Sequence, residues 1–282
     1  MSEASSAGVL PESPGAPLGA MEAAGMGWRL LVADFWQMWL AALIVEAILA
    51  GIKIIPCLSC LAPITRIFLW PPLMAGLFWV IRDRVDGAPI RMGRLFGAFK
   101  HCFWQTVVAG LPVTLAFLVL GVVFFIVGMS LGMTVGLLAG GRGHDMDPAA
   151  VAMLYGIDFA SILAREAITG IVGLFFMFAL LAIWETPQDG WGAAKRAARL
   201  MVQNFGAAIV FGLVFGALWF VATLGVLGCC VGIILTMAVF QAWHAASLVY
   251  LYRSWTGQPL VQPLPGAAMP DTYAPPEGAL PA

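Results

Sequence analysis

Residues 205–252 read FGAAIVFGLVFGALWFVATLGVLGCCVGIILTMAVFQAWHAASLVYLY and contain no Asp, Glu, Lys or Arg. A helix needs about 20 apolar residues to cross the hydrocarbon core of a bilayer. This run is too long for one membrane span and suits two spans joined at Gly228, Cys229 and Cys230. It therefore predicts a helical hairpin in a membrane.

The composition of the whole chain agrees with this reading. The 282 residues are 61% hydrophobic and 10% charged, whereas a soluble domain has roughly 25% charged residues. So few charges cannot cover a compact body with a polar surface, and we expect the outer surface to face lipid. The net charge of -1, without a long basic block, gives no indication of nucleic-acid binding.

Further apolar runs of membrane length precede residues 205–252, and we predict an all-α, polytopic membrane protein with six transmembrane helices. We expect Pro71 and Pro72 to bend or break the second of them. The predicted spans are 33–55, 64–82, 104–130, 164–184, 206–227 and 231–252.

The membrane domain is predicted to cover residues 28–256. Residues 1–27 are rich in Ala, Gly, Ser, Pro and Glu, and residues 257–282 are rich in Pro. Both compositions are typical of disordered segments, because they offer few large apolar side chains to bury. We therefore expect a disordered tail at each end.

The cations are distributed unevenly between the two sides that six crossings would create. One side receives Arg29, Arg253, five cations between the second and third spans, and three between the fourth and fifth. Because basic loops stay on the side of synthesis, this asymmetry predicts that both termini are cytoplasmic.

Both of these basic loops have helical periodicity. In 91–103 and in 189–205 the apolar residues share one face, and the cations lie on the other. Asp189 is a suitable N-cap for the second segment. We expect two amphipathic helices in the membrane interface, with cations directed at anionic headgroups. The candidate headgroup ligands are Arg91, Arg94, Lys195, Arg196 and Arg199.

A plainer interpretation of these loops remains open, in which they are elbows that only obey the charge rule. Each half of the chain runs span, turn, basic helix, span. This shared order suggests a parallel pseudo-repeat about an axis along the membrane normal.

Short motifs in both halves resemble a known family. The second half has Trp191, Ala194, Lys195, Arg199, Asn204, Phe205, Tyr252-Arg253 and Gly257, and the first half has Pro71-Pro72, Gly76, Arg82, Gly87 and Leu95-Phe96-Gly97. Over roughly residues 27–257 the chain resembles the YciC-like group, bacterial six-helix inner-membrane proteins of unknown function. That group is akin to the membrane portion of some glycerophosphodiester phosphodiesterases.

The resemblance implies a multi-pass fold and a location in the bacterial inner membrane. It implies no activity, because the phosphodiesterases need a separate soluble catalytic domain that we do not expect in this chain.

Glu46 lies in the middle of the first predicted span. A carboxylate near the bilayer midplane costs about 2.5–3.5 kcal/mol on insertion scales, so such residues are candidates for function. Gln241 and His244 lie one turn apart at a similar depth in the sixth span, and they can partner Glu46 if the two spans pack together. The group is either a binding site for protons or solutes or an interhelical hydrogen bond that fixes packing.

Glycines recur every four residues near the end of the third span. Because they lack side chains, they let another backbone approach closely. They predict tight packing, either within the chain or between copies in a homo-oligomer. The residues are Gly128, Gly132, Gly136 and Gly140.

Four cysteines lie at span ends that the topology places on the outer face, where disulfides can form in bacteria. They are disulfide candidates, with free thiols or a four-thiolate metal site as alternatives. These residues are Cys57, Cys60, Cys229 and Cys230.

No nucleotide-binding, metalloprotease or serine-hydrolase motif is present, and we expect neither a cofactor nor an enzymatic activity. The first functional hypothesis is a non-enzymatic membrane protein that contacts lipid or a membrane partner. The alternative is a small-solute transporter or channel that uses Glu46, Gln241 and His244.

Overall fold

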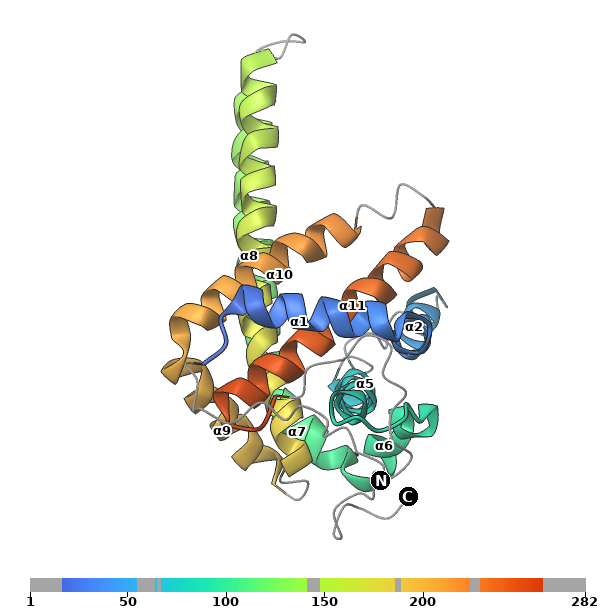
Figure 1. Cartoon of the computed structure of the whole chain (residues 1–282). Coiled ribbons are helices and arrows are strands. Elements are labelled where there is room, and N and C mark those ends of the chain that lie inside the picture. The colour runs from blue at the N-terminus through green and yellow to red at the C-terminus, as the bar shows by residue number, and fades with distance from the viewer. Residues whose placement is uncertain are drawn as a thin grey trace, which may run out of the picture.

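The computed structural model describes residues 17–54, 64, 67–140, 148–185, 189–223 and 229–260, and these residues are helical apart from short turns (Figure 1). No strand occurs in the described ranges. The helices are α1 (Ala20–Ala33), α2 (Phe35–Ile54), α5 (Trp70–Val85), the 3₁₀ helix η1 (Met92–Phe96), α6 (Gly97–His101), α7 (Phe103–Gly140), α8 (Pro148–Glu185), α9 (Gly190–Gln203), α10 (Phe205–Thr223) and α11 (Cys229–Trp255).

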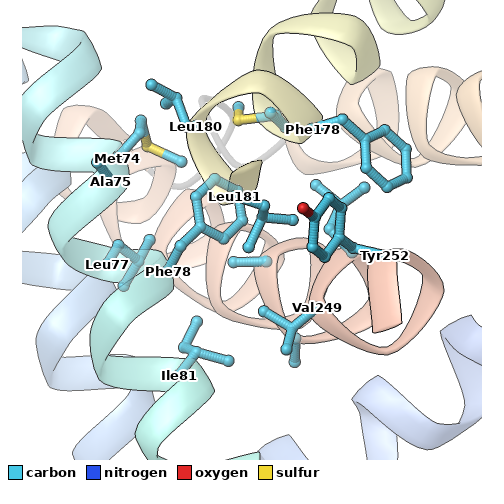
Figure 2. Close-up of a cluster of buried hydrophobic side chains, with 14 of the residues drawn as sticks. Met74, Ala75, Leu77, Phe78, Ile81, Phe178, Leu180, Leu181, Val249 and Tyr252 are labelled. Carbon is cyan, nitrogen blue, oxygen red and sulfur yellow. The ribbon is translucent and has the colours of Figure 1, made fainter. Parts of the chain in front are cut away.

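The core forms where α5, α8 and α11 meet (Figure 2). Phe78 of α5 and Tyr252 of α11 are about 1% exposed, and Phe178 of α8 is fully buried among them. Phe178 also stacks on Trp255 with ring centroids 5.0 Å apart. Because α11 contacts α1, α2, α5, α8 and α10, it is the central helix of the bundle.

Helix α1 corrects the predicted N-terminal boundary. Residues 20–27, which we expected in a disordered tail, form the first half of α1 and pack on α11. The indole nitrogen of Trp243 donates a hydrogen bond to the carbonyl oxygen of Ala24 at 2.9 Å. A side chain at Gly27 would overlap Ser247, so the two backbones lie in direct contact. The small residues read as a disordered composition are instead a packing surface.

The C-terminal boundary also moves, by a few residues. Gly257 adopts a positive φ of 69° after α11 ends, and the amide of Gln258 bonds back to the carbonyl oxygen of Arg253 at 2.8 Å. Residues 257–260 therefore close the helix end. The rest of the predicted C-terminal tail lies outside the described residues.

Among the described residues, four helices are long and apolar enough to cross a membrane, judged by length and composition. Their qualifying segments are Phe35–Ile52, Phe103–Ser130, Ile168–Glu185 and Gly232–Trp255. Helices α9 and α10 satisfy the same criterion together, although they bend by 99° at their junction, which gives up to five. The predicted span 64–82 corresponds to the shorter α5, in which Pro71 and Pro72 occupy the first turn. Prolines are tolerated there, and a turn at Leu69 separates the helical residues 67–68 from α5, so the expected break in the span lies just before the prolines.

Helices α7 and α8 are each 38 residues long and run side by side well beyond the other helices (Figure 1). At 1.5 Å per residue each helix extends about 57 Å, roughly twice the hydrocarbon thickness of a bilayer. Helix α7 continues through Pro112 without a break. We call the outer part of this pair, residues 118–140 and 148–166, the hairpin, and the remaining described residues the body.

The two basic segments differ. Helix α9 is the predicted amphipathic helix, and the Asp189 carboxylate caps it by accepting a hydrogen bond from the amide of Gly192 at 2.7 Å. The prediction of one helix over 91–103 is wrong, because this segment is the short η1 and α6 followed by a break at Cys102. Two glycines, Gly93 and Gly97, weaken its helical propensity. In addition, Leu95 is held directly against α5 at Gly76.

Candidate binding cavity

A partly enclosed cavity of about 610 Å³ lies where six helices converge, and we call it the cavity. This volume is in the range of small-molecule sites, which are mainly apolar with a few polar groups. Its described lining comes from α2 (Glu46, Leu49), Ile67 and Trp70 at the start of α5, α7 (Thr114, Phe117, Leu118), α8 (Thr169, Gly170, Gly173, Met177), α10 (Phe211, Gly212, Phe215, Gly216, Trp219) and α11 (Phe240, Gln241, His244).

The three polar residues singled out from the sequence all line this cavity. Glu46 comes from α2, while Gln241 and His244 come from α11, and these two helices pack against each other. Gln241 is only 4% exposed, and its side-chain oxygen has no hydrogen-bond donor. The structure thus brings the three together at one cavity.

Two threonines that line the cavity, Thr114 and Thr169, were not predicted from the sequence. Thr114 donates its hydroxyl hydrogen to the carbonyl oxygen of Gly110 at 3.0 Å, as threonine commonly does within a helix. Thr169 of α8 lines the same cavity. Polar residues inside apolar runs were the signal that could have found both.

Aromatic rings form much of the cavity wall. Phe211 and Phe215 stack with centroids 4.4 Å apart, and the His244 imidazole lies 4.7 Å from the Phe215 ring. Trp219 meets Phe240 edge to face at 5.4 Å. These contacts hold the rings in place, so the wall is largely preformed.

Glycines of α8 and α10 let these two helices cross closely beside the cavity. A Cβ atom at Gly170 would lie 2.6 Å from the carbonyl oxygen of Gly212, which is too close for any side chain. Gly173 differs, because a Cβ there would come no closer than 3.9 Å, to Phe117. Gly212 and Gly216 therefore serve close packing within the chain, whereas Gly173 borders open space.

The charged residues gather at one end of the body. Arg84 pairs with Asp34, Arg94 with Asp83, Arg253 with Asp86, and Arg196 with Glu185. Gln258 bonds both Glu185 and, at 3.4 Å, Arg82, and Arg82 lies 3.8 Å from Asp86. We call this group the ion-pair cluster. It joins the start of α2 to the ends of α5, α8 and α11.

The ion-pair cluster includes two of the five candidate headgroup ligands. Arg94 and Arg196 are paired with carboxylates, and the Arg94 guanidinium also lies 5.4 Å from the Trp184 ring centroid. Arg91, Lys195 and Arg199 are exposed. Asp83 and Glu185, which lie beside the predicted span ends, were the signal in the sequence that these two arginines are paired.

Burial shifts the pKa of several titratable groups near this end, among them Asp83 and Cys102. It raises the pKa of the Asp83 carboxyl, although the hydrogen bond and charge of Arg94 oppose the shift. It also raises the pKa of the Cys102 thiol to about 11. Cys102 is 1% exposed, so its thiol is inert packing in the body.

Several predicted features cannot be placed. Cys57 and Cys60 lie outside the described residues, as do the side chains of Cys229 and Cys230 at the start of α11. Of the four hairpin glycines, Gly128 has open space around it, and the surroundings of the other three are outside the description. In the described part of the chain, no three His, Cys, Asp or Glu side chains come together as a metal site would need.

Comparison with protein-family models, with curated proteins and with solved structures finds no match to this chain.

Proposed function

We propose that this chain is an integral membrane protein that binds a small amphipathic solute in a cavity within the membrane. One observation carries the proposal: Glu46, Gln241 and His244, from two different helices, line one cavity whose other walls are mostly apolar. An interhelical hydrogen bond that only fixed packing would need no open volume beside it. Binding, and with it transport, is therefore favoured over a purely structural role for these residues.

The membrane arrangement in this proposal has six crossings, made by α2, α5 with the residues before it, α7, α8, α10 and α11. Both termini face the cytoplasm of a bacterium, and the membrane is its inner membrane. The ion-pair cluster supports a common side for the alternate helix ends, since it joins the start of α2 to the ends of α5, α8 and α11. The parallel pseudo-repeat and membership of the YciC-like group are parts of the same proposal.

The binding test uses 4-hexylbenzyl alcohol, a neutral amphipath with an aromatic body, on protein purified in an uncharged detergent. A ligand that binds only the folded state raises the unfolding temperature. We expect a rise of a few degrees for the wild type and none for Gly173→Leu. The new side chain fills the cavity, and its Cβ has room beside Phe117.

The matched control is Gly156→Leu, on the outer part of the same helix α8, where an added Cβ meets nothing within 4 Å. It should respond to the probe like the wild type. Equal shifts in the wild type and in Gly173→Leu would show that the probe binds elsewhere and would overturn the proposal. If Gly173→Leu is not monodisperse, the smaller Gly173→Val takes its place.

A second role, contact with anionic lipid, is favoured by the exposed cations of the basic segments, among them Arg91, Lys195 and Arg199. Arg91, Lys195 and Arg199 have exposed apolar neighbours, among them Phe96 at 47% and Trp191 at 53%. Exposed cations beside exposed aromatic rings are typical of a membrane interface. This role needs no enzymatic chemistry.

The lipid role is tested by replacing Arg91, Lys195 and Arg199 together with Gln. The measurement compares binding to liposomes with and without anionic lipid. We expect the wild type to prefer anionic liposomes and the triple variant to lose most of this preference. A preference that survives in the triple variant would rule out the lipid role.

The hairpin glycines remain candidates for a homo-oligomer contact. Gly128 faces open space within one chain, so any close packing there must come from a second copy. Light scattering of Gly128→Leu tests this, with a change from oligomer to monomer as the expected result.

A further inference from the structure

We infer that the outer face of α1 is a membrane-interface surface, which places apolar side chains among the headgroups and upper acyl chains of the bilayer and turns the charges beside them toward water. The described lining of the cavity includes no residue of α1, so this surface is separate from the cavity. The inference rests only on the membrane location in the proposed function.

Helix α1 presents three rows of side chains along its length. The first packs on the rest of the body and consists of Ala20, Ala23, Ala24, Gly27, Leu30 and Leu31. The second is exposed, and its spacing of four, three and four residues keeps it on one face of the helix. We call it the apolar row: Met21, Gly25, Trp28 and Val32. Beside it lies the charged row, Glu22 and Arg29, which is also exposed. A helix with adjoining apolar and charged faces is typical of the membrane interface.

The apolar row is open in the described part of the chain. Met21 is 64% exposed, Val32 is 58% exposed, and a Cβ at Gly25 would meet nothing within 4 Å. Trp28 is half-exposed, and the Trp243 ring of α11 meets it edge to face at 5.3 Å. Tryptophan is enriched where membranes meet water. The body therefore holds a large aromatic side chain at its surface, in the position of an interfacial anchor.

The ends of α1 show at which level of the molecule this face lies. Before the helix, the amide of Leu18 donates a hydrogen bond to the Ser254 hydroxyl oxygen at 2.6 Å, and after it Asp34 pairs with Arg84. Both contacts lie at the end of the body that carries the ion-pair cluster. A helix of 14 residues, about 21 Å long, that is held to one end of the body at both of its own ends cannot cross the bilayer. It lies across that end, where charged groups and headgroups meet.

Continuity along the chain indicates that lipid covers the apolar row. Helix α1 leads directly into α2 (Figure 1), where Trp36 and Leu40 are exposed. Both belong to Phe35–Ile52, a segment long and apolar enough to span a membrane. The bilayer around this segment therefore reaches the helix that precedes it. A second protein copy fits less well, because stable interfaces bury about 800 Å² per partner and this row offers three apolar side chains around one glycine.

The test places single cysteines in a variant whose five native cysteines are Ser, and labels each with bimane. The protein is reconstituted in vesicles of phosphatidylcholine and phosphatidylglycerol. Two quenchers are compared: lipid that is brominated near the headgroup end of its acyl chains, and iodide in the water. We expect the brominated lipid to quench bimane at Met21→Cys and Val32→Cys at least about threefold more than at Arg29→Cys, and iodide to give the opposite order.

Two further variants keep the test sharp. Leu40→Cys on α2 is the reference for a span and should be quenched by brominated lipid. Gly25→Cys lies on the apolar row where an added side chain has room, so it replaces either of the other two row variants if that variant is not monodisperse. It should behave as they do.

The outcomes separate this inference from the membrane location on which it rests. If Leu40→Cys is quenched by brominated lipid while Met21→Cys and Val32→Cys respond only to iodide, α1 faces water and the inference is overturned. If the apolar row is protected from both quenchers, protein covers it, which also overturns the inference. If brominated lipid does not quench Leu40→Cys, the proposed membrane location itself fails.

Discussion

Some glycines of the body lie against a second backbone, whereas the described glycines at the outer part of the hairpin do not. In the body, a side chain at Gly76 would overlap the carbonyl oxygen of Leu95, and one at Gly170 would lie 2.6 Å from the carbonyl oxygen of Gly212. In the hairpin, a Cβ added at Gly121, Gly128 or Gly156 meets nothing within 4 Å.

This difference shows what a glycine pattern can and cannot predict. Regularly spaced glycines leave one face of a helix open to close approach by another backbone. A close helix crossing also requires that a second backbone lies at that face. Gly76 stands outside any run of regularly spaced glycines, yet it makes one of the closest contacts in the body. The regular series that begins at Gly128 has no partner there in the single chain.

The largest expected effect is from Gly76→Ala. The added methyl group would displace the backbone of η1 from α5, and overpacking against a rigid backbone costs about 3 kcal/mol or more. We expect little monodisperse protein and a much lower unfolding temperature, measured in detergent beside Gly128→Ala. Normal yield and stability of Gly76→Ala would mean that η1 does not lie on α5.

Ion pairs within the body differ in how deeply they are buried. The Arg253 side chain is 5% exposed and pairs with Asp86. Asp86→Asn should destabilise the fold by about 3 kcal/mol, because it leaves a buried cation without its partner. The Arg196 side chain is 42% exposed, so Arg196→Gln should cost less than about 1 kcal/mol. Chemical unfolding of both variants checks this order, and equal costs would contradict it.

Thiol reactivity compares the two regions directly. The pKa of Cys102 is about 11, so at pH 8 only about one molecule in a thousand carries the reactive thiolate. In a variant with Ser at the other four cysteines, maleimide should label Cys102 at least about tenfold more slowly than a cysteine placed at Met133, which is 65% exposed. Raising the pH toward 11 increases the thiolate fraction of Cys102 and should reduce the difference between the two labelling rates. Equal rates at pH 8 would place Cys102 on the surface.

The smallest expected effect is from Gly128→Ala. The methyl group meets nothing within 4 Å, and Ala favours a helix over Gly by about 0.5–1 kcal/mol. Thermal unfolding of the monomer should show equal or slightly higher stability. A loss comparable to that of Gly76→Ala would show that the hairpin glycines are packed.

The sequence predicted the all-helical class, apolar segments within the four long helices α2, α7, α8 and α11, and α9 with its Asp189 cap. It also singled out Glu46, Gln241 and His244, which line one cavity. These features follow from local periodicity and from depth along a span, both of which a single sequence records. The number of crossings and their orientation stay predictions.

Features that depend on tertiary contact were missed. Helix α1 was read as a disordered tail because its alanines and glycine reveal a packing surface only when α11 lies against them. The segment 91–103 was read as one helix because the pattern does not record the contact between Leu95 and Gly76. Arg94 and Arg196 were read as free cations because Asp83 and Glu185 are neighbours only in the fold.

The most direct test of binding in the cavity is photolabelling with 4-hexylbenzyl alcohol that carries a diazirine on its hexyl chain. After irradiation and digestion, we predict cross-links at cavity residues such as Met177 of α8 and Phe215 of α10, which disappear in Gly173→Leu and persist in Gly156→Leu. Cross-links confined to the exposed face of α7, at residues such as Val122, and unchanged by Gly173→Leu would contradict the account.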